Sequence, residues 1–313
     1  MNRSLVKILI GIWLVIAVGL TGFLAYAIHY NKSAGDVFSF FKWRDVSAST
    51  VQKDENIPLD NFNKINVDFS SADIIVQTTD EPNLRVVQKA SSELKEEQKF
   101  TISKENNTVT IKRNTSDMIF SIFNFGNFGE KIEVYIPKTY TKDLDIRSAS
   151  GDVVFNSDIE LNNINCFTSS GDFYGKNNIS ANNIILKSSS GDISIGDLMS
   201  KSYKVDISSG DIKINSLSGS GEVEAASGDI TISYKDINEY SNVSAQSGDV
   251  KLLIPKELSF QFAGKCSSGD INSNFDLNYK SKRGNEATAQ VGSGPYKKIN
   301  ANTNSGDIDI RSN

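Results

Sequence analysis

The sequence predicts an all-β fold: a parallel β-solenoid (β-helix) of about 20 residues per coil, preceded by one N-terminal transmembrane helix. Three observations lead to this prediction. A Ser-Gly-Asp tripeptide recurs eight times at nearly constant spacing, apolar and polar residues alternate on both sides of it, and residues 8–28 carry no charge. A fixed period of this size is typical of stacked coils, and alternation of period two indicates half-buried strands.

The first element is an apolar run over residues 8–28, ILIGIWLVIAVGLTGFLAYAI. At about 1.5 Å per residue, a helix of this length covers roughly 31 Å, the thickness of a bilayer core. Arg3 and Lys7 lie on its short side, where no acidic residue occurs. The positive-inside rule therefore predicts a cytoplasmic N-terminus over residues 1–7 and an extracytoplasmic remainder. We expect a single-pass protein of the cell membrane, in contact with the lipid bilayer through residues 8–28.

A cleaved signal peptide is the alternative interpretation of the same run. Ala25-Tyr26-Ala27 has the small-x-small pattern of a cleavage site. However, the apolar run is longer than the usual signal core of about 7–15 residues. The length therefore favours an uncleaved anchor.

The next segment, residues 29–56, shows no repeat and is predicted to be a juxtamembrane linker. The solenoid is predicted over 57–313, because the Ile-Pro pairs at 57–58, 136–137 and 254–255 stand at the same distance before a turn position. The period is interrupted at about 81–131. We expect irregular early coils or a cap there, since the ends of a solenoid need covering.

Each coil is predicted to bend at the glycine of its Ser-Gly-Asp turn, since glycine adopts positive φ without strain. The expected structural turn positions are Gly151, Gly171, Gly191, Gly210, Gly228, Gly248, Gly269 and Gly306. The last interval, from 269 to 306, is interpreted as two repeat units shortened by a loop. The apolar residues that flank each turn are expected to face the core, and the intervening Ser, Asp, Lys, Asn and Thr to face solvent.

The aspartates of the turns are expected to stack in a column along the solenoid. They are Asp152, Asp172, Asp192, Asp211, Asp229 and Asp249, continued by Asp270 and Asp307. At about 5 Å spacing, each pair repels by roughly 1 kcal/mol even at the dielectric constant of water. Bound calcium would offset this repulsion, so the column is a candidate metal site. The favoured interpretation is a structural Asx-type turn, because calcium-binding solenoids use denser Gly-Asp repeats.

Composition excludes several classes of function. The chain has a single histidine, His29, which argues against Ser-His-Asp or Cys-His catalysis and against a histidine-rich metal site. A net charge of −5 with no basic block argues against nucleic acid as a partner. The acidic residues recur in every coil as a structural device would, so we expect no catalytic residues and no cofactor, and the chain is not predicted to be an enzyme.

One irregular apolar stretch, residues 118–128 (MIFSIFNFGNF), is the best local candidate for a partner contact. Its aromatic residues are Phe120, Phe123, Phe125 and Phe128. The favoured interpretation is a hydrophobic cap over the end of the solenoid. The alternative is an exposed contact, since large exposed apolar patches mark interaction sites.

The segment KIEVYIPKTYTKDLDIRSASGDV over residues 131–153 resembles the bacterial putative-adhesin family of β-strand-repeat proteins, a domain of unknown function. Residues 250–271 repeat the pattern, and 293–310 are similar to its terminal repeat. With one N-terminal membrane helix, the arrangement is similar to LiaG-type membrane-anchored envelope proteins. The resemblance implies the solenoid fold and brings no established catalytic residue, since fold does not fix function.

Together these observations predict a non-enzymatic, membrane-anchored extracytoplasmic β-solenoid, an interaction or scaffold protein of the cell envelope associated with envelope stress. Its expected partner is an envelope protein or a cell-wall polymer. The alternatives are an adhesin that binds an external surface and, less favoured, a β-helix enzyme acting on polysaccharide. The short predicted linker, residues 29–56, argues against reach beyond a thick wall.

Overall fold

The protein is described by a computed structural model over residues 50–113 and 129–312, within one compact unit, Ala48–Asn313. In these ranges the regular structure is β-strand, except for one short 3-10 turn, η2 (Glu96–Gln98). The predicted transmembrane helix over 8–28 and the Phe-rich stretch over 118–128 lie outside the described residues. In the part that the structure describes, no helix is long and apolar enough to cross a membrane.

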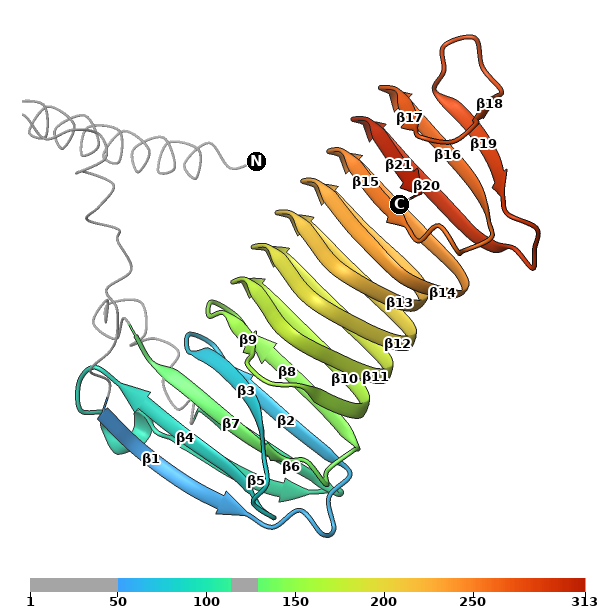
Figure 1. Cartoon of the computed structure of the whole chain (residues 1–313). Coiled ribbons are helices and arrows are strands. Elements are labelled where there is room, and N and C mark those ends of the chain that lie inside the picture. Colours follow the sequence, from blue (N-terminus) through green and yellow to red (C-terminus); the bar gives the residue numbers. More distant parts are fainter. Residues whose placement is uncertain (1–49, 114–128, 313) are drawn as a thin grey trace, which may run out of the picture. The chain divides into compact units, whose positions relative to one another are not determined.

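The centre of the molecule is a stack of parallel coils, in which one long strand leads up to each Ser-Gly-Asp turn (Figure 1). These strands are β10 (Ile159–Ser170), β11 (Phe173–Ser190), β12 (Ile193–Ser209), β13 (Ile212–Ser227) and β14 (Ile230–Ser247). Each pairs in parallel with the next along the chain. The parallel stacking of coils of about 20 residues is therefore confirmed.

The core consists of continuous rows of side chains that run along the stack. Ile193, Ile212 and Ile230 are partners in register two residues after their turns, and all three are buried. A second row before the turns contains Cys166, Leu186, Val205, Val223 and Val243. A fully buried aliphatic side chain contributes roughly 1.5–3 kcal/mol relative to an exposed one, so these rows hold the coils together.

The order of the coils departs from the order of the sequence at the C-terminal end. The last coil, β20 (Lys297–Ser305) and β21 (Ile308–Ser312), lies between β14–β15 (Val250–Ile254) and the coil of β16 (Phe260–Ser268) and β17 (Ile271–Ser273). The interpretation of the interval from Gly269 to Gly306 as two repeat units is thus wrong. The intervening residues instead contain β18 (Asn278–Tyr279) and β19 (Glu286–Val291), and β19 pairs antiparallel with β16. This pairing covers a strand edge that would otherwise stay open.

The first coils also pair out of sequence order. The coil of β2 (Lys64–Phe69) and β3 (Asp73–Thr79) lies against β8 (Asp143–Ser148) and β9 (Val153–Phe155) on one side. On its other side are β6 (Thr108–Arg113) and β7 (Lys131–Pro137). Three antiparallel strands then end the sheet: β4 (Leu84–Ala90) on β7, β1 (Thr50–Ile57) on β4 and β5 (Phe100–Glu105) on β6. The described part of the irregular segment at about 81–131 therefore supplies two antiparallel border strands, β4 and β5.

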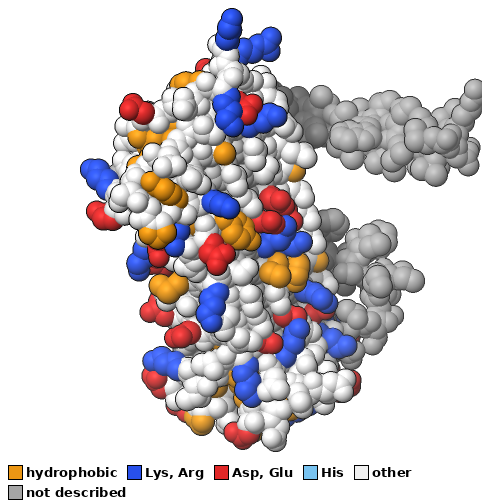
Figure 2. Space-filling model, turned by 90° about the vertical axis from the view of Figure 1, so that its right-hand side faces the viewer, with side chains coloured by type: hydrophobic (Ala, Val, Ile, Leu, Met, Phe, Trp, Pro, Cys, Tyr) orange, Lys and Arg blue, Asp and Glu red, His pale blue; other side chains and the backbone are white. Residues whose placement is uncertain are grey.

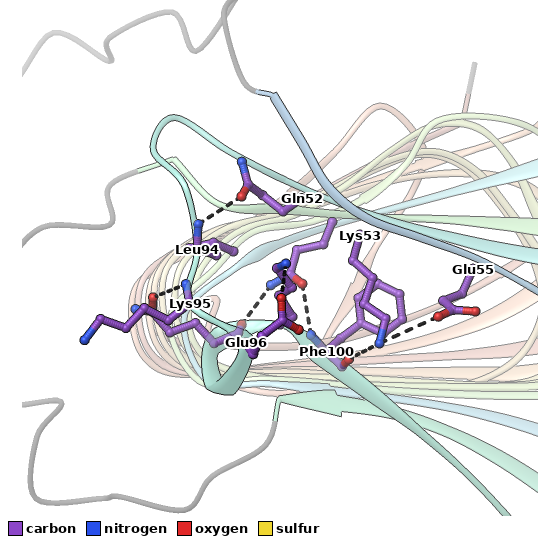
Figure 3. A network of polar contacts seen from close by, with 10 residues as sticks. Gln52, Lys53, Glu55, Leu94, Lys95, Glu96 and Phe100 are labelled. Carbon is purple, nitrogen blue, oxygen red and sulfur yellow. Dashed lines mark hydrogen bonds and ion pairs between the residues drawn. The ribbon is translucent and has the colours of Figure 1, made fainter.

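Polar contacts close this N-terminal border across the segment between β4 and β5 (Figure 3). The Gln52 side-chain oxygen accepts from the Leu94 N–H at 2.9 Å. Lys53 Nζ donates to the Phe100 carbonyl at 3.0 Å and lies 4.9 Å from the centre of the Phe100 ring. Leu94 and Phe100 are themselves buried, so these contacts satisfy backbone groups at a dry edge.

All of strand β1 except Ile57 lies within residues 29–56, the range that the sequence predicts as a linker. Its pairing with β4 runs from Thr50–Ala90 to Ile57–Leu84, so the end of that range is part of the sheet. Ile57 is its buried residue, while Val51 is 57% exposed. An edge strand can join a sheet through backbone hydrogen bonds alone. The polar sequence of β1 therefore did not indicate a strand.

Candidate functional site

The turn aspartates form a hydrogen-bonded ladder along the edge of the coil stack. In every coil but the last, one carboxylate oxygen, Oδ1, accepts the backbone N–H of the aspartate in the next coil, at 2.7–3.2 Å. The ladder begins at Asp73 and passes through Asp152, Asp172, Asp192, Asp211, Asp229, Asp249, Asp307 and Asp270. A backbone donor to each carboxylate offsets part of the repulsion within the column.

The turn glycines pack directly on the glycine of the adjacent coil. A Cβ atom on Gly228 would lie 2.0 Å from the Gly210 carbonyl oxygen, and one on Gly151 would lie 2.1 Å from that of Ala72. Six of the turn positions have φ between 124° and 140°: Gly191, Gly210, Gly228, Gly248, Gly269 and Gly306. Gly151 and Gly171 lack such a φ. Close approach of the coils, and not only positive φ, therefore requires glycine at these turns.

In the aspartate column, the pKa of Asp152, near the start of the ladder, is shifted from its ordinary value. Burial raises the pKa of the Asp152 carboxyl, the Asp172 N–H opposes that rise, and the carboxylates of Asp73 and Asp172 add to it. The Tyr174 hydroxyl donates to Asp172 Oδ2 at 2.5 Å, and this hydrogen bond is the main cause of the raised pKa of Tyr174. The charged form of Asp152 is thus disfavoured in the folded protein.

We expect Asp152→Asn to unfold at a higher urea concentration than the wild type at pH 7. The asparagine oxygen still accepts the Asp172 N–H, whereas the buried charge is removed. Because the folded-state pKa of Asp152 is raised, its charge destabilises the fold above that pKa. The gain should shrink as the pH falls and vanish below the ordinary aspartate pKa of 3.8. Urea unfolding at pH 7 and pH 3 measures the difference; an equal gain at both values would contradict the electrostatic cause.

In the described residues, the aspartate ladder does not form a calcium-binding site. Over 50–113 and 129–312, no group of three or more Asp, Glu, His or Cys side chains is arranged to hold a metal ion. All ladder aspartates before Asp270 already use one oxygen within the fold, whereas calcium takes six to eight oxygen ligands. Calcium binding along the column stays a prediction.

The Phe-rich candidate contact, Phe120, Phe123, Phe125 and Phe128, lies outside the described residues. The residues that flank it are described and are joined by an ion pair. The guanidinium of Arg113 donates to the carboxylate of Glu130, whose side chain is 1% exposed. Gln88 donates to the other Glu130 oxygen at 2.8 Å. This pair therefore ties the end of β6 to the residue that precedes β7.

The outer faces of the coils are polar. On the face in Figure 2, basic and acidic side chains are interspersed and hydrophobic ones are scattered. The large exposed hydrophobic side chains of the described residues are Val51, Tyr174, Met199, Tyr240 and Tyr279. Ladders of asparagine cross from coil to coil, such as Asn183 to Asn163 at 2.8 Å and Asn300 to Asn242 at 2.8 Å. Such a surface can make many hydrogen bonds to an extended polar partner.

Two open hollows lie near the C-terminal end of the stack. The first, of about 550 Å³, lies over β15, β21 and β17. Asp309 and Arg311 form an ion pair beside Lys251 and Asn272 there. The second lies beside β18 and β19, in a segment that breaks the repeat. That break in the repeat is the feature of the sequence that marks this hollow.

Comparison with protein families gives one match over most of the described chain. Residues 62–311 match the family model described as Toastrack DUF4097. This range begins after β1 and contains all eight Ser-Gly-Asp turns. No curated protein matches the chain.

Three solved structures illustrate what this chain is similar to. A "putative cell adhesion protein" from Clostridium sporogenes has 12% identity and a TM-score of 0.31, over 85% of this chain and 100% of that one. A "putative adhesin" from Bacteroides fragilis has 12% identity and a TM-score of 0.49, over 84% and 97%. A "putative lipid binding protein" from Parabacteroides distasonis has 15% identity and a TM-score of 0.49, over 82% and 96%. Identities this low carry no function from one chain to another.

Proposed function

The chain belongs to the Toastrack DUF4097 family, and from this premise we propose that it is a non-enzymatic interaction protein of the cell envelope. In this proposal residues 8–28 anchor it in the membrane, and the coils bind a wall polymer or an envelope protein outside the cell. An association with envelope stress is part of the same proposal. It rests on the resemblance to LiaG-type proteins.

The observation that carries the proposal is the contrast between the two sides of each coil. Apolar residues fill the inside in continuous rows, while Asn, Ser, Lys and Asp side chains repeat outward at the strand spacing of about 4.8 Å. The Asp ladder and the stacked glycines hold this outer surface rigid. A rigid, regular and polar surface suits an extended partner, because little side-chain order is lost on binding.

The anchor is supported by the sequence alone. Residues 8–28 have the length and composition of a membrane span, and Arg3 and Lys7 precede them. The described part of the chain starts at β1, on the border of the sheet opposite to β18 and β19 (Figure 1). Eleven strand pairings lead from β1 to β17, so an anchored protein would hold its last coil about 50 Å from β1.

We expect a fragment of residues 48–313, which corresponds to the compact unit, to co-sediment with isolated cell walls and not with protein-free lipid vesicles. Each mixture is measured with and without a calcium chelator. Wall binding that is lost on chelation would support calcium bridging along the Asp column. Wall binding that persists would support recognition by side chains alone. If the fragment sediments with neither walls nor vesicles, the wall component is excluded, and crosslinking of the full chain in cells tests a protein partner.

A further inference from the structure

The second hollow, of about 680 Å³, lies on the outer face of β16 and its neighbours β19 and β20. It is formed where β16 meets β19, and the segment that leads into β18 makes its third side. Its lining is Gln261, Phe262, Ala263, Asp276, Leu277, Asn278, Thr288, Ala289, Gln290, Lys298 and Asn300. Its size is within the roughly 300–1,000 Å³ that is typical of ligand sites. Most of it comes from residues outside the regular repeat.

Register explains why there is space at this point. Ala263 is the partner of Asn300 on one side and of Thr288 on the other, and Thr288 is the partner of Asn278. Residues directly opposite each other in a sheet point to the same face. Ala263 is exposed, so its small side chain makes the floor and the longer polar side chains of its partners make the walls.

The walls are rich in side-chain amides. Gln261 donates to Gln290 at 3.3 Å, and Gln290 donates to the Tyr296 hydroxyl at 2.9 Å. Asn300 donates to Asn242 through its side-chain nitrogen, so the side-chain oxygen of Asn300 can accept from a further partner. Each amide offers both donors and an acceptor, so the set can bind neighbouring hydroxyl or acetamide groups.

The charge of the lining is balanced. It contains one cation, Lys298, and one carboxylate, Asp276. Neither is in an ion pair with another described residue. A site with no net charge and many amides favours an uncharged polar ligand over a phosphate polymer.

Tyrosines stand around the hollow. Tyr240 is the register partner of Lys298, on the same face as Gln261, and is 37% exposed. Tyr296 is bound to Gln290 on the same side. A tyrosine presents an apolar ring together with a polar tip, which suits the C–H faces and hydroxyl groups of a sugar.

We propose that this hollow binds an uncharged sugar chain that carries acetamide groups, the chemistry of N-acetylated hexosamine polymers. The amides bind the acetamide and hydroxyl groups, the ring of Tyr240 packs on a sugar face, and the Ala263 floor admits the chain. The site deepens the proposed function, on which its biological meaning rests, because it names the wall component as glycan.

The test is calorimetric titration of the 48–313 fragment with the β-1,4-linked tetramer of N-acetylglucosamine. The matched probe is the glucose tetramer of the same linkage, which lacks the acetamide groups. Open sites of this kind bind weakly, so we expect a Kd of about 0.1–1 mM for the first probe. The second should bind at least about 10-fold more weakly, since the amides lose their partners. Equal affinity for both probes would overturn the proposal. It would also be overturned if the acetylated tetramer gave no heat of binding at a concentration 10-fold above about 1 mM.

Ala263→Leu fills the floor of the hollow at an exposed position and should weaken binding of the acetylated tetramer at least about 10-fold. Ser244→Leu is the control, since Ser244 is on β14 and is not part of the lining. Near-equal unfolding midpoints of the two variants would show that the fold is kept. Unchanged affinity in Ala263→Leu would exclude the hollow.

The failures of the hollow and of the wall function are distinguishable. If wild type and Ala263→Leu both sediment with cell walls, the proposed function stands and the hollow is excluded as its site. If the wild type binds the acetylated tetramer but not walls, the hollow stands and the wall function falls. Gln261→Ala, which removes one amide from the walls of the hollow, should give an intermediate affinity.

Discussion

Gly228→Ala should destabilise the coil stack more than any exposed substitution in the described residues, by at least about 3 kcal/mol. Two causes add. Gly228 has φ of 126°, which an L-residue with a Cβ rarely adopts. The new Cβ would also lie 2.0 Å from the Gly210 carbonyl oxygen and 2.6 Å from its carbon. Those are backbone atoms, so relief requires the coils to separate. Urea unfolding of the 48–313 fragment measures the loss.

Gly284→Ala is the matched control because it carries only the first cause. Gly284 also has positive φ, 72°, but its nearest atom to a new Cβ is a Tyr279 ring carbon at 3.9 Å. We expect a loss of about 1 kcal/mol there, the cost of the backbone conformation alone. Gly151→Ala isolates the second cause, since its Cβ would meet Ala72 at 2.1 Å without a positive φ. If all three variants unfold alike, close approach of the coils is not what requires glycine.

Glu130→Leu should cost about 3 kcal/mol, because it leaves the guanidinium of Arg113 without its partner at a largely buried position. The Arg113 side chain is 22% exposed and burial lowers its pKa, so water replaces the carboxylate only in part. Gln88 also loses an acceptor, although its amide still donates to the Gln98 carbonyl at 3.0 Å. Thermal unfolding of the fragment checks the loss.

Two further variants separate the buried pair from ordinary surface charge. The double variant Glu130→Leu with Arg113→Met should recover most of the stability, since no uncompensated charge remains. Lys99→Ala removes the Lys99–Glu96 ion pair, in which the Glu96 side chain is 86% exposed, and we expect no measurable shift. A loss in the double variant as large as in Glu130→Leu would mean that the site needs the charges themselves.

The candidate site was predictable to different degrees. The Asp column and the turn glycines follow from the repeat, because identical residues at the same point of stacked coils must lie side by side. The hydrogen bond that a backbone N–H donates to the carboxylate of the neighbouring coil was not visible in the sequence, since it depends on side-chain rotamers. The hollow around Ala263 was missed because β18, β19 and β20 bring together residues 261 to 300 through an antiparallel pairing that has no period.

The sequence by itself determined which residues face inward and that the coils stack in parallel. Rows such as Ile193, Ile212 and Ile230 must leave water together, and the alternation of period two allows only one face to be buried. The tertiary structure alone decided which coil lies beside which. Backbone hydrogen bonds form equally well between coils that are consecutive in the sequence and coils that are not. Closing a longer loop also costs little more free energy than closing a shorter one. The last coil can therefore insert before the preceding one, β1 can join the border, and the hollow forms where these choices meet.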